Sequence, residues 1–373
     1  MTHISTPEQE VLIIGAGLSG LLTAYRLQQA GISATVWEAR ERMGGRILTI
    51  SLPDGRGAFD LGPTWFWTDH HHVQRLAQEF EIEHFEQYES GAALFDRGVG
   101  LPAQRFRPQG EMPISYRLDG GMGALIDHLA ARLPQTAVHL NTAVAQIARQ
   151  EEGLLVSGQS QGQPVSTTAQ HVVLTLPPRL VTETISFTPT LPSTVTTALH
   201  NTQTWMGQAM KAVLIYGKPF WREKGLSGLG ISHVGPIQQF HDTTSFHDTT
   251  PGDEALAALF GWLGNDSGGR QMPLAERRQA VIAQTVRMFG PEAADPLHYA
   301  EMNWATQPYT SQSLIVEQEH PRYGHPELQE PQLTGRLHWA TTEASPLNGG
   351  YLDGAIYRGE VVAAGLVSTL RRK

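Results

Sequence analysis

The chain has 373 residues, 40% hydrophobic and 17% charged, which is typical of a globular protein and long enough to predict two domains. The formal net charge of −9, with no long basic run, argues against nucleic acid or an anionic membrane as the main partner. The absence of cysteine excludes disulfides, zinc–thiolate sites and a cysteinyl cofactor link, and the polar N-terminal segment and strand-length apolar runs predict a cytoplasmic protein without a membrane span.

Residues 11–20 read VLIIGAGLSG, an apolar run followed by the pattern G-x-G-x-x-G. The run predicts a buried strand, the apolar periodicity after it predicts a helix ended by Gly31, and residues 34–38 predict a second strand. A glycine turn between a strand and a helix binds the pyrophosphate of a dinucleotide at the helix N-terminus. This segment therefore predicts a βαβ dinucleotide-binding unit.

Glu38 stands at the end of the second predicted strand, 18 residues after Gly20. An acidic residue at about this distance accepts hydrogen bonds from the ribose hydroxyls of a bound dinucleotide. By itself Glu38 could equally be a solvated residue at a strand end. The strand, glycines and helix in register favour the ribose contact.

A second glycine turn, ARERMGGRI, follows at residues 39–47. An NAD domain would normally continue into another helix here. The turn resembles the GG motif that follows the first βαβ unit in flavoproteins with two dinucleotide-binding folds, and it therefore indicates FAD. Arg46 would supply cationic donors to the phosphates.

An aromatic stretch follows the next predicted strand, at residues 65–67 after Gly62 and Pro63. It is either a core cluster or a loop over the flavin. Three histidines at 70–72 could suggest a metal, but adjacent side chains at a helix start point in different directions, and no metal site is predicted. The repeat FHDTT-S-FHDTT at 240–250 is interpreted as a loop duplication.

The rest of the chain alternates strand and helix patterns. Helices are expected from residue 73, over 123–133 and over 275–289. Strands are expected over 138–147, 154–156, 171–178, 210–216 and 255–262, with a polar hairpin tip over 158–168. The segment 337–364 is expected to hold a strand, a glycine turn and a helix.

Lys211 is a single lysine within the apolar run MKAVLIY. A buried lysine is costly unless it is paired or hydrated. Two interpretations remain open from the residues alone, an edge-strand lysine that points to solvent and a functional lysine.

In this order the motifs resemble those of the flavin-containing amine oxidases, a family that includes monoamine oxidase, polyamine oxidase and the flavin histone demethylases. The resemblance covers nearly the whole chain and rests on GAGLSG, EAR, MGGR, DLGPTWF, NTAV, TLPP, MKAVLIYGKPFW, NW and TTEASPLNGGYLDGAIYRG. The implied fold class is α/β (α+β), a two-dinucleotide-binding-domain flavoprotein. Its Rossmann-like FAD domain would be discontinuous, over 1–72, 118–200 and 305–373, and its smaller mixed-sheet substrate domain would span 73–117 and 201–304.

The resemblance implies roles toward FAD for several groups of residues. The pyrophosphate cradle would be Gly15, Ala16, Gly17, Ser19 and Gly20; the ribose end Glu38, Ala39 and Arg40; the phosphate and ribityl wall Gly44, Gly45 and Arg46; the isoalloxazine contact Leu61, Gly62, Pro63 and Thr64; the adenosine end Val144, Thr175 and Pro177; and the C-terminal contribution Glu343, Tyr351, Leu352 and Ala355.

The catalytic residues implied by the resemblance are Lys211, Trp304 and Tyr351. The matching lysine of the family holds a water at flavin N5, and Tyr351 matches one ring of an aromatic cage for the amine. The second cage position falls on Leu314, which together with Trp65 is expected to line the substrate pocket. The position of the cysteinyl link of monoamine oxidases falls on Ser313, so FAD is expected to be non-covalent.

The expected reaction is oxidation of a small-molecule amine by hydride transfer to flavin N5, giving an imine, then an aldehyde or ketone, with O2 reduced to H2O2. Three alternatives remain: a C–C desaturase or isomerase like carotenoid desaturase or protoporphyrinogen oxidase, a non-catalytic flavoprotein, and an NAD dehydrogenase. Lys211 and Tyr351 favour the amine oxidase.

Overall fold

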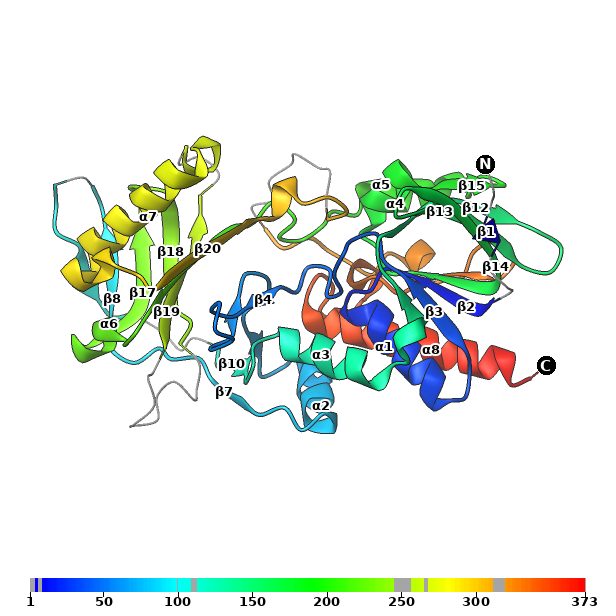
Figure 1. Cartoon of the computed structure of the whole chain (residues 1–373), viewed down its shortest axis with the longest axis horizontal. Helices are drawn as coiled ribbons and strands as arrows, with labels where there is room; N and C mark the ends of the chain where they lie inside the picture. Colours follow the sequence, from blue (N-terminus) through cyan, green and yellow to red (C-terminus); the bar gives the residue numbers. More distant parts are fainter. Residues whose placement is uncertain are drawn as a thin grey trace.

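The computed structural model describes residues 4–5, 9–98, 100–108, 113–244, 256–264, 268–310 and 319–372. Two large sheets lie at opposite ends of an elongated molecule, and the last helix, α8 Leu352–Leu370, lies in the half that holds the larger sheet (Figure 1). Within the described part of the chain, no helix combines the length and the apolar character needed to cross a membrane.

The larger sheet has nine strands, and its central order is β11-β3-β2-β14-β13-β12-β15, with β1 and β21 also paired to β14. The strands are β1 Ile4–Ser5, β2 Gln9–Ile14, β3 Ala34–Trp37, β11 Val138–His139, β12 Thr142–Arg149, β13 Leu154–Ser160, β14 Gln163–Leu174, β15 Ser186–Thr188 and β21 Leu337–Trp339. β2 pairs in parallel with both β3 and β14. Its apolar run is continuous because alternate residues enter two different cores, one on each face of the sheet.

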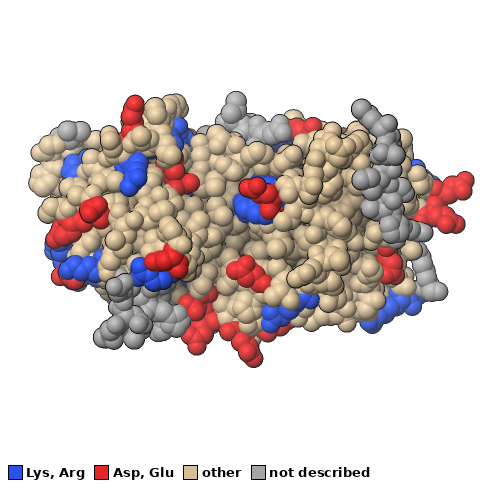
Figure 2. Space-filling model, viewed as in Figure 1, with Lys and Arg blue, Asp and Glu red and all other residues tan. Residues whose placement is uncertain are grey.

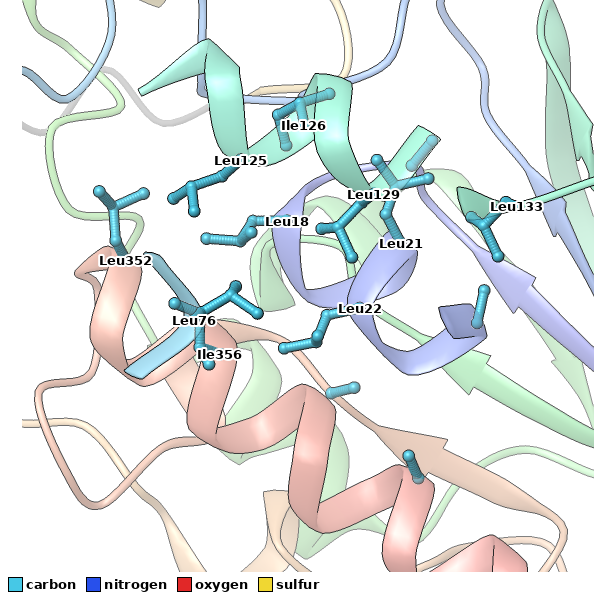
Figure 3. Packing of buried hydrophobic residues seen from close by; sticks show 14 of the residues in the cluster. Leu18, Leu21, Leu22, Leu76, Leu125, Ile126, Leu129, Leu133, Leu352 and Ile356 are labelled. Atoms are coloured by element: carbon cyan, nitrogen blue, oxygen red, sulfur yellow. The ribbon is translucent and has the colours of Figure 1, made fainter. Parts of the chain in front are cut away.

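Four helices form the core on one face of this sheet: α1 Leu18–Gln29, α2 His71–Glu79, α3 Gly123–Arg132 and α8 Leu352–Leu370. Figure 3 shows Leu21, Leu76, Leu129 and Ile356, one from each helix, directed into a common apolar layer. The buried residues recur at helical spacing, and each buried leucine contributes about 1.5–3 kcal/mol relative to exposure. This packing places the first turns of α1 against Gly359 of α8.

The opposite face of the nine-stranded sheet packs against α4 Pro178–Thr184 and α5 Ser193–Asn201. The structure also has two small sheets. One pairs β4 Thr49–Ile50 with β5 Phe59–Asp60. The other has the order β6-β10-β7, with β6 Phe66–Trp67, β10 Ser115–Leu118 and β7 His84–Glu86. The connection from β5 to β6 contains the GPTW segment.

The second large sheet has seven strands in the order β20-β16-β19-β18-β17-β8-β9. They are β8 Ala92–Asp96, β9 Gln104–Phe106, β16 Met210–Tyr216, β17 Leu226–Ser232, β18 Ile237–Asp242, β19 Ala257–Leu263 and β20 His298–Asn303, and this unit also has α6 Phe220–Glu223 and α7 Leu274–Phe289. α7 covers one face (Figure 1). The other face packs against residues of the β4–β5 region.

Two strand predictions differ from the structure. Residues 138–147, expected to be one strand, form β11 and β12, which are separated at Asn141, a residue with φ of 53°. The expected polar hairpin tip at 158–168 is mostly strand, because β13 and β14 continue to a two-residue turn at Gln161–Gly162, both with positive φ. Such a turn matches the twist of an antiparallel hairpin.

The predicted domain limits stay a prediction. All seven strands of the second sheet fall within 73–117 and 201–304. α2 lies mostly within the same predicted domain, yet its Val73 and Leu76 pack in the core of α1 and α8.

The surface shows acidic and basic side chains interspersed on the face drawn in Figure 2. Exposed ion pairs such as Lys218 with Glu223, at 3.0 Å, are part of this pattern. Pairs of this kind contribute about 0–1 kcal/mol each, so stability rests on the cores.

Candidate active site

The glycine turn between β2 and α1 has three different steric requirements. Gly15 has a φ of +107°, and Gly20 lies so close to the Gly15 carbonyl oxygen that a Cβ there would collide with it. Gly17 has open space where its Cβ would be and lines the cavity described below. This turn therefore allows a phosphate group to approach the backbone at the N-terminus of α1.

The second glycine turn lies directly against the first. The Gly44 N–H donates to the Ala16 carbonyl at 2.8 Å, and Gly44 and Gly45 both have positive φ. Arg42 holds the turn by donating to the carbonyls of Met43, Ile47 and Gly45 at 2.8–3.1 Å. The two motifs thus form one continuous wall.

Glu38 is buried between the two turns. Its carboxylate accepts the Ala16 N–H at 2.7 Å and the Arg40 N–H at 2.9 Å. A carboxylate has about four acceptor sites, so two remain for ribose hydroxyls. The side chain lines the cavity.

Arg40 and Arg46 have protein partners. Arg40 Nη2 donates to the Pro308 carbonyl at 2.6 Å and to Thr310 Oγ1 at 2.5 Å, which fixes this loop beside the cavity. Burial lowers the pKa of Arg40, and the Glu38 carboxylate opposes this shift. Arg46 Nη1 pairs with the fully buried Glu343 at 2.7 Å. Burial alone would lower the pKa of Arg46, but the Glu343 carboxylate outweighs that effect and raises it.

Lys211 is buried although β16 is next to the edge of the seven-stranded sheet, because β16 lies between β19 and the edge strand β20. Its Nζ donates to the Gly62 carbonyl and to Thr64 Oγ1, both at 2.5 Å, and lies 4.4 Å from the ring centroid of Phe260. Burial lowers the pKa of Lys211 to about 7, while the Asp60 carboxylate opposes the shift. The interpretation as a solvent-facing edge lysine is therefore wrong.

Trp304 holds the same loop from a neighbouring position. Its Nε1 donates to the Leu61 carbonyl at 2.9 Å, and it directly follows β20. Two buried donors of the second sheet, Lys211 and Trp304, thus attach residues 61–64 to that sheet. This loop connects the two large units at the cavity.

The N-terminus of α8 closes another side of the cavity. Tyr351 precedes the helix, and no side-chain hydrogen bond caps its first turn, whose Leu352 lines the cavity. The ring of Tyr351 lies 5.5 Å from Trp67 and is stacked on His320 at 4.6 Å. A helix N-terminus carries partial positive charge and favours an anionic or carbonyl group.

These elements enclose a cavity of about 400 Å³. The predicted site residues that line it are Gly15, Gly17, Ser19, Glu38, Ala39, Arg40, Gly44, Gly45, Arg46, Gly62, Pro63, Thr64, Trp65, Val144, Thr175, Pro177, Lys211, Trp304, Tyr351, Leu352 and Ala355. Ala16, Gly20, Leu61 and Glu343 do not line it and act on residues that do. Leu314 and Ser313 lie outside the described residues.

Several lining residues were not assigned from the sequence, notably His70, Met206, Trp262 and Tyr309. Trp262 lies directly opposite Lys211 in the β16–β19 register, which no local pattern reveals. His70 was visible within the histidine run. Phe95 of β8 does not line the cavity, and its ring packs against Phe106 and His233.

Comparisons with known proteins agree with this geometry. Residues 97–367 match the family described as flavin containing amine oxidoreductase, and residues 13–80 match an NAD(P)-binding Rossmann-like domain. The chain is 26% identical to an L-amino acid dehydrogenase of Synechocystis sp. over 469 positions, covering 97% of this chain and 95% of that one. It is 24% identical to a putrescine oxidase of Kocuria rosea over 472 positions, covering 96% and 95%.

A solved structure of putrescine oxidase bound to putrescine superposes with a TM-score of 0.80 at 21% identity, covering 98% of this chain and 100% of that one. This likeness and the Rossmann-like match confirm the predicted fold class. Both sequence alignments are longer than the 373 residues of this chain, so these relatives carry segments that it lacks.

Proposed function

The chain belongs to the flavin-containing amine oxidoreductases, and from this premise we propose that it oxidises the C–N bond of a small amine to an imine, with O2 as the electron acceptor. FAD is the cofactor. The observation that carries the proposal is the buried Lys211, which lies in the wall of the same cavity as the dinucleotide-binding turns.

The cavity suits FAD along its length. Gly17 leaves room for the pyrophosphate, Glu38 keeps acceptor capacity for a ribose, and the uncapped N-terminus of α8 can donate to a flavin carbonyl. The absence of cysteine supports a non-covalent flavin. When bound, FAD would supply the acceptor for the substrate hydride and the two electrons that reduce O2 to H2O2.

Lys211 is proposed to hold and polarise a water in the cavity. Its two hydrogen bonds to Gly62 and Thr64 fix the position of Nζ. Because burial lowers the pKa of Lys211 to about 7, its side-chain amino group is largely neutral above that pH and offers a lone pair as an acceptor. The lysine can then accept a hydrogen bond or a proton where the charged form could only donate.

The substrate nitrogen must be neutral to lose a hydride from the adjacent carbon. An alkylammonium ion has a pKa of about 10.4 in water, so the pocket must favour loss of its proton. Trp65, Trp262 and Tyr351 line an aromatic part of the cavity, where desolvation disfavours the charged form. Imine hydrolysis would then give an aldehyde or ketone.

We also propose that the preferred substrate carries one amino group on an apolar substituent. Among the described residues that line the cavity, the only carboxylate is Glu38, which is already hydrogen-bonded to Ala16 and Arg40. A second ammonium group would be buried without a countercharge. Aromatic rings, in contrast, provide large apolar contact area.

Anaerobic mixing of the holoenzyme with a panel of primary and secondary amines tests the proposal. Amines should bleach the flavin absorbance, and readmitted O2 should restore it with release of peroxide. Bleaching by a polyene or a porphyrinogen but by no amine would favour the desaturase alternative. Bleaching by none of these compounds, in protein that a chemical reductant still bleaches, would favour a non-catalytic flavoprotein.

A further inference from the structure

His70 is a buried histidine that lines the cavity and has no part in the steps above. It lies between β6 and α2, and 3% of its surface is exposed. Its Nδ1 is buried and has no hydrogen-bond partner among the described residues. A buried polar atom without a partner is costly, so its retention at a cavity wall points to a partner supplied there.

The position of His70 is fixed against the first turn of α8. The N–H groups of His72 and Val73 both donate to Asp353 Oδ1, at 2.7 and 3.1 Å, and Asn348 holds the other carboxylate oxygen at 3.0 Å. The imidazole also lies 5.4 Å from the ring of Tyr351. His70 and the uncapped N-terminus of α8 therefore face the same end of the cavity.

Burial and the charged groups around His70 have opposing effects on its pKa. Burial lowers its pKa below the usual value, whereas Asp353 and Asp69 oppose the shift and His71 adds to it. Tyr351, the other titratable group against the ring, has its own pKa raised by burial and stays a neutral phenol. The lowered pKa favours the neutral imidazole before electrons enter the site.

We propose that His70 takes up a proton when electrons enter the site, so that reduction of the cofactor depends on pH through this residue. This inference rests on the proposed function. The amine loses a hydride, with both electrons, to the cofactor, and the negative charge gained there is stabilised by the N-terminus of α8. His70 then binds one proton from solvent, forming one N–H bond and exchanging no electrons.

The charge change explains why uptake would follow reduction. An opposite charge within about 4–6 Å raises the pKa of a histidine by stabilising its protonated form. In the oxidised site burial dominates, and in the reduced site the new charge opposes burial. His70 should therefore have a lower pKa in the oxidised enzyme and a higher pKa in the reduced enzyme. At a pH between these two values, reduction should consume one additional proton.

Electrochemical titration of the purified holoenzyme across a pH series measures this uptake directly, because the slope of midpoint potential against pH gives protons per electron. The wild type should take up one proton more than His70→Gln near neutral pH. His200→Gln is the matched control, since His200 is exposed and does not line the cavity, and it should behave as the wild type. Equal uptake by wild type and His70→Gln would overturn the proposal.

If His70→Gln fails to bind FAD, NMR of the wild-type holoenzyme with isotope-labelled histidine answers the same question. One imidazole should change from neutral to protonated on reduction, and no change at any histidine would overturn the proposal. Both measurements use electrochemical reduction and need no amine. A protein that no amine reduces would thus disprove the proposed function while leaving this test intact.

Discussion

Lys211 owes its environment to one pairing that the sequence does not display. The apolar run around it predicts a strand, and the structure places that strand at Met210–Tyr216 as expected. Whether the lysine faces solvent depends on β20, which lies more than 80 residues further along the chain and covers the second edge of β16. The sequence could therefore identify Lys211 as a candidate residue, but it could not show that the side chain is buried.

Replacing Lys211 by methionine should remove a pH-dependent limb of the reaction. In the wild type, flavin turnover at saturating amine should rise as pH increases through about 7, because the neutral lysine is the active form. The variant should lack this limb and react about 100-fold more slowly. Stopped-flow measurement of the reductive and oxidative half-reactions checks both. The same limb in the variant would show that another group is responsible.

Glu343 should matter more for stability before the cofactor binds than after. Glu343→Gln leaves Arg46 without its buried countercharge and should lower the free energy of unfolding of the apoprotein by about 3 kcal/mol. The pyrophosphate of FAD can supply a new countercharge, so the holoenzyme should lose less. Denaturant titration measures both forms. Glu223→Gln, in an exposed pair, is the control and should change stability by less than about 1 kcal/mol.

Equal losses from Glu343→Gln in apoprotein and holoenzyme would contradict this role. Arg46 would then serve only to fix the chain segment of Glu343, and the phosphate contact predicted for it would lose its support.

At the level of elements, local signals predicted β2, α1 and β16 well, because their boundaries coincide with glycine turns and apolar runs. The division of residues 138–147 escaped prediction because it depends on partners: β11 pairs with β3, and β12 pairs with β13. A change of partner within one apolar segment has no local signature other than the turn residue Asn141.

The glycines of the β2–α1 turn should respond differently to the same substitution. Gly20→Ala places a methyl group against the Gly15 carbonyl and should destabilise the apoprotein. Gly17→Ala finds open space on the protein side, at a φ of −76° that alanine tolerates, so the apoprotein should unfold as the wild type does. Because its methyl group enters the cavity, FAD affinity should fall at least about 10-fold.

Unfolding of the two apoproteins and fluorescence titration with FAD make this comparison. If Gly17→Ala binds FAD with wild-type affinity, the pyrophosphate does not lie at this turn.

At the scale of the whole molecule, motif order was sufficient to recognise the family and the fold, since each motif marks a fixed place in the chain. Most of the predicted cofactor residues line one cavity. The aromatic part of the cavity was less accessible to prediction, because Trp262 reaches it through strand pairing in the second sheet and His70 through the packing of its segment against α8.

The composition of the cavity predicts discrimination by charge. Hexylamine and hexamethylenediamine have similar shapes and differ by one terminal ammonium group. Since no free carboxylate lines the described cavity, the diamine should have at least about 100-fold lower kcat/KM, or about 2.7 kcal/mol. Trp205 lines the cavity, so Trp205→Glu adds a carboxylate to its wall and should reduce the difference in kcat/KM between the two amines. Equal or faster oxidation of the diamine by the wild type would contradict the single-amine preference.

The cavity draws on both extremes of the chain. Thr23 of α1 contacts the Gly359 carbonyl of α8, 336 positions away, and Ser19 bonds to the Ala340 carbonyl. During synthesis on the ribosome, the pyrophosphate turn emerges more than 300 residues before the helix that closes the cavity beside it. A nascent chain that has not yet reached α8 lacks this wall, so FAD should be retained only after that helix has been made. In cells short of riboflavin, the protein should accumulate as apoprotein that can be filled when the vitamin returns.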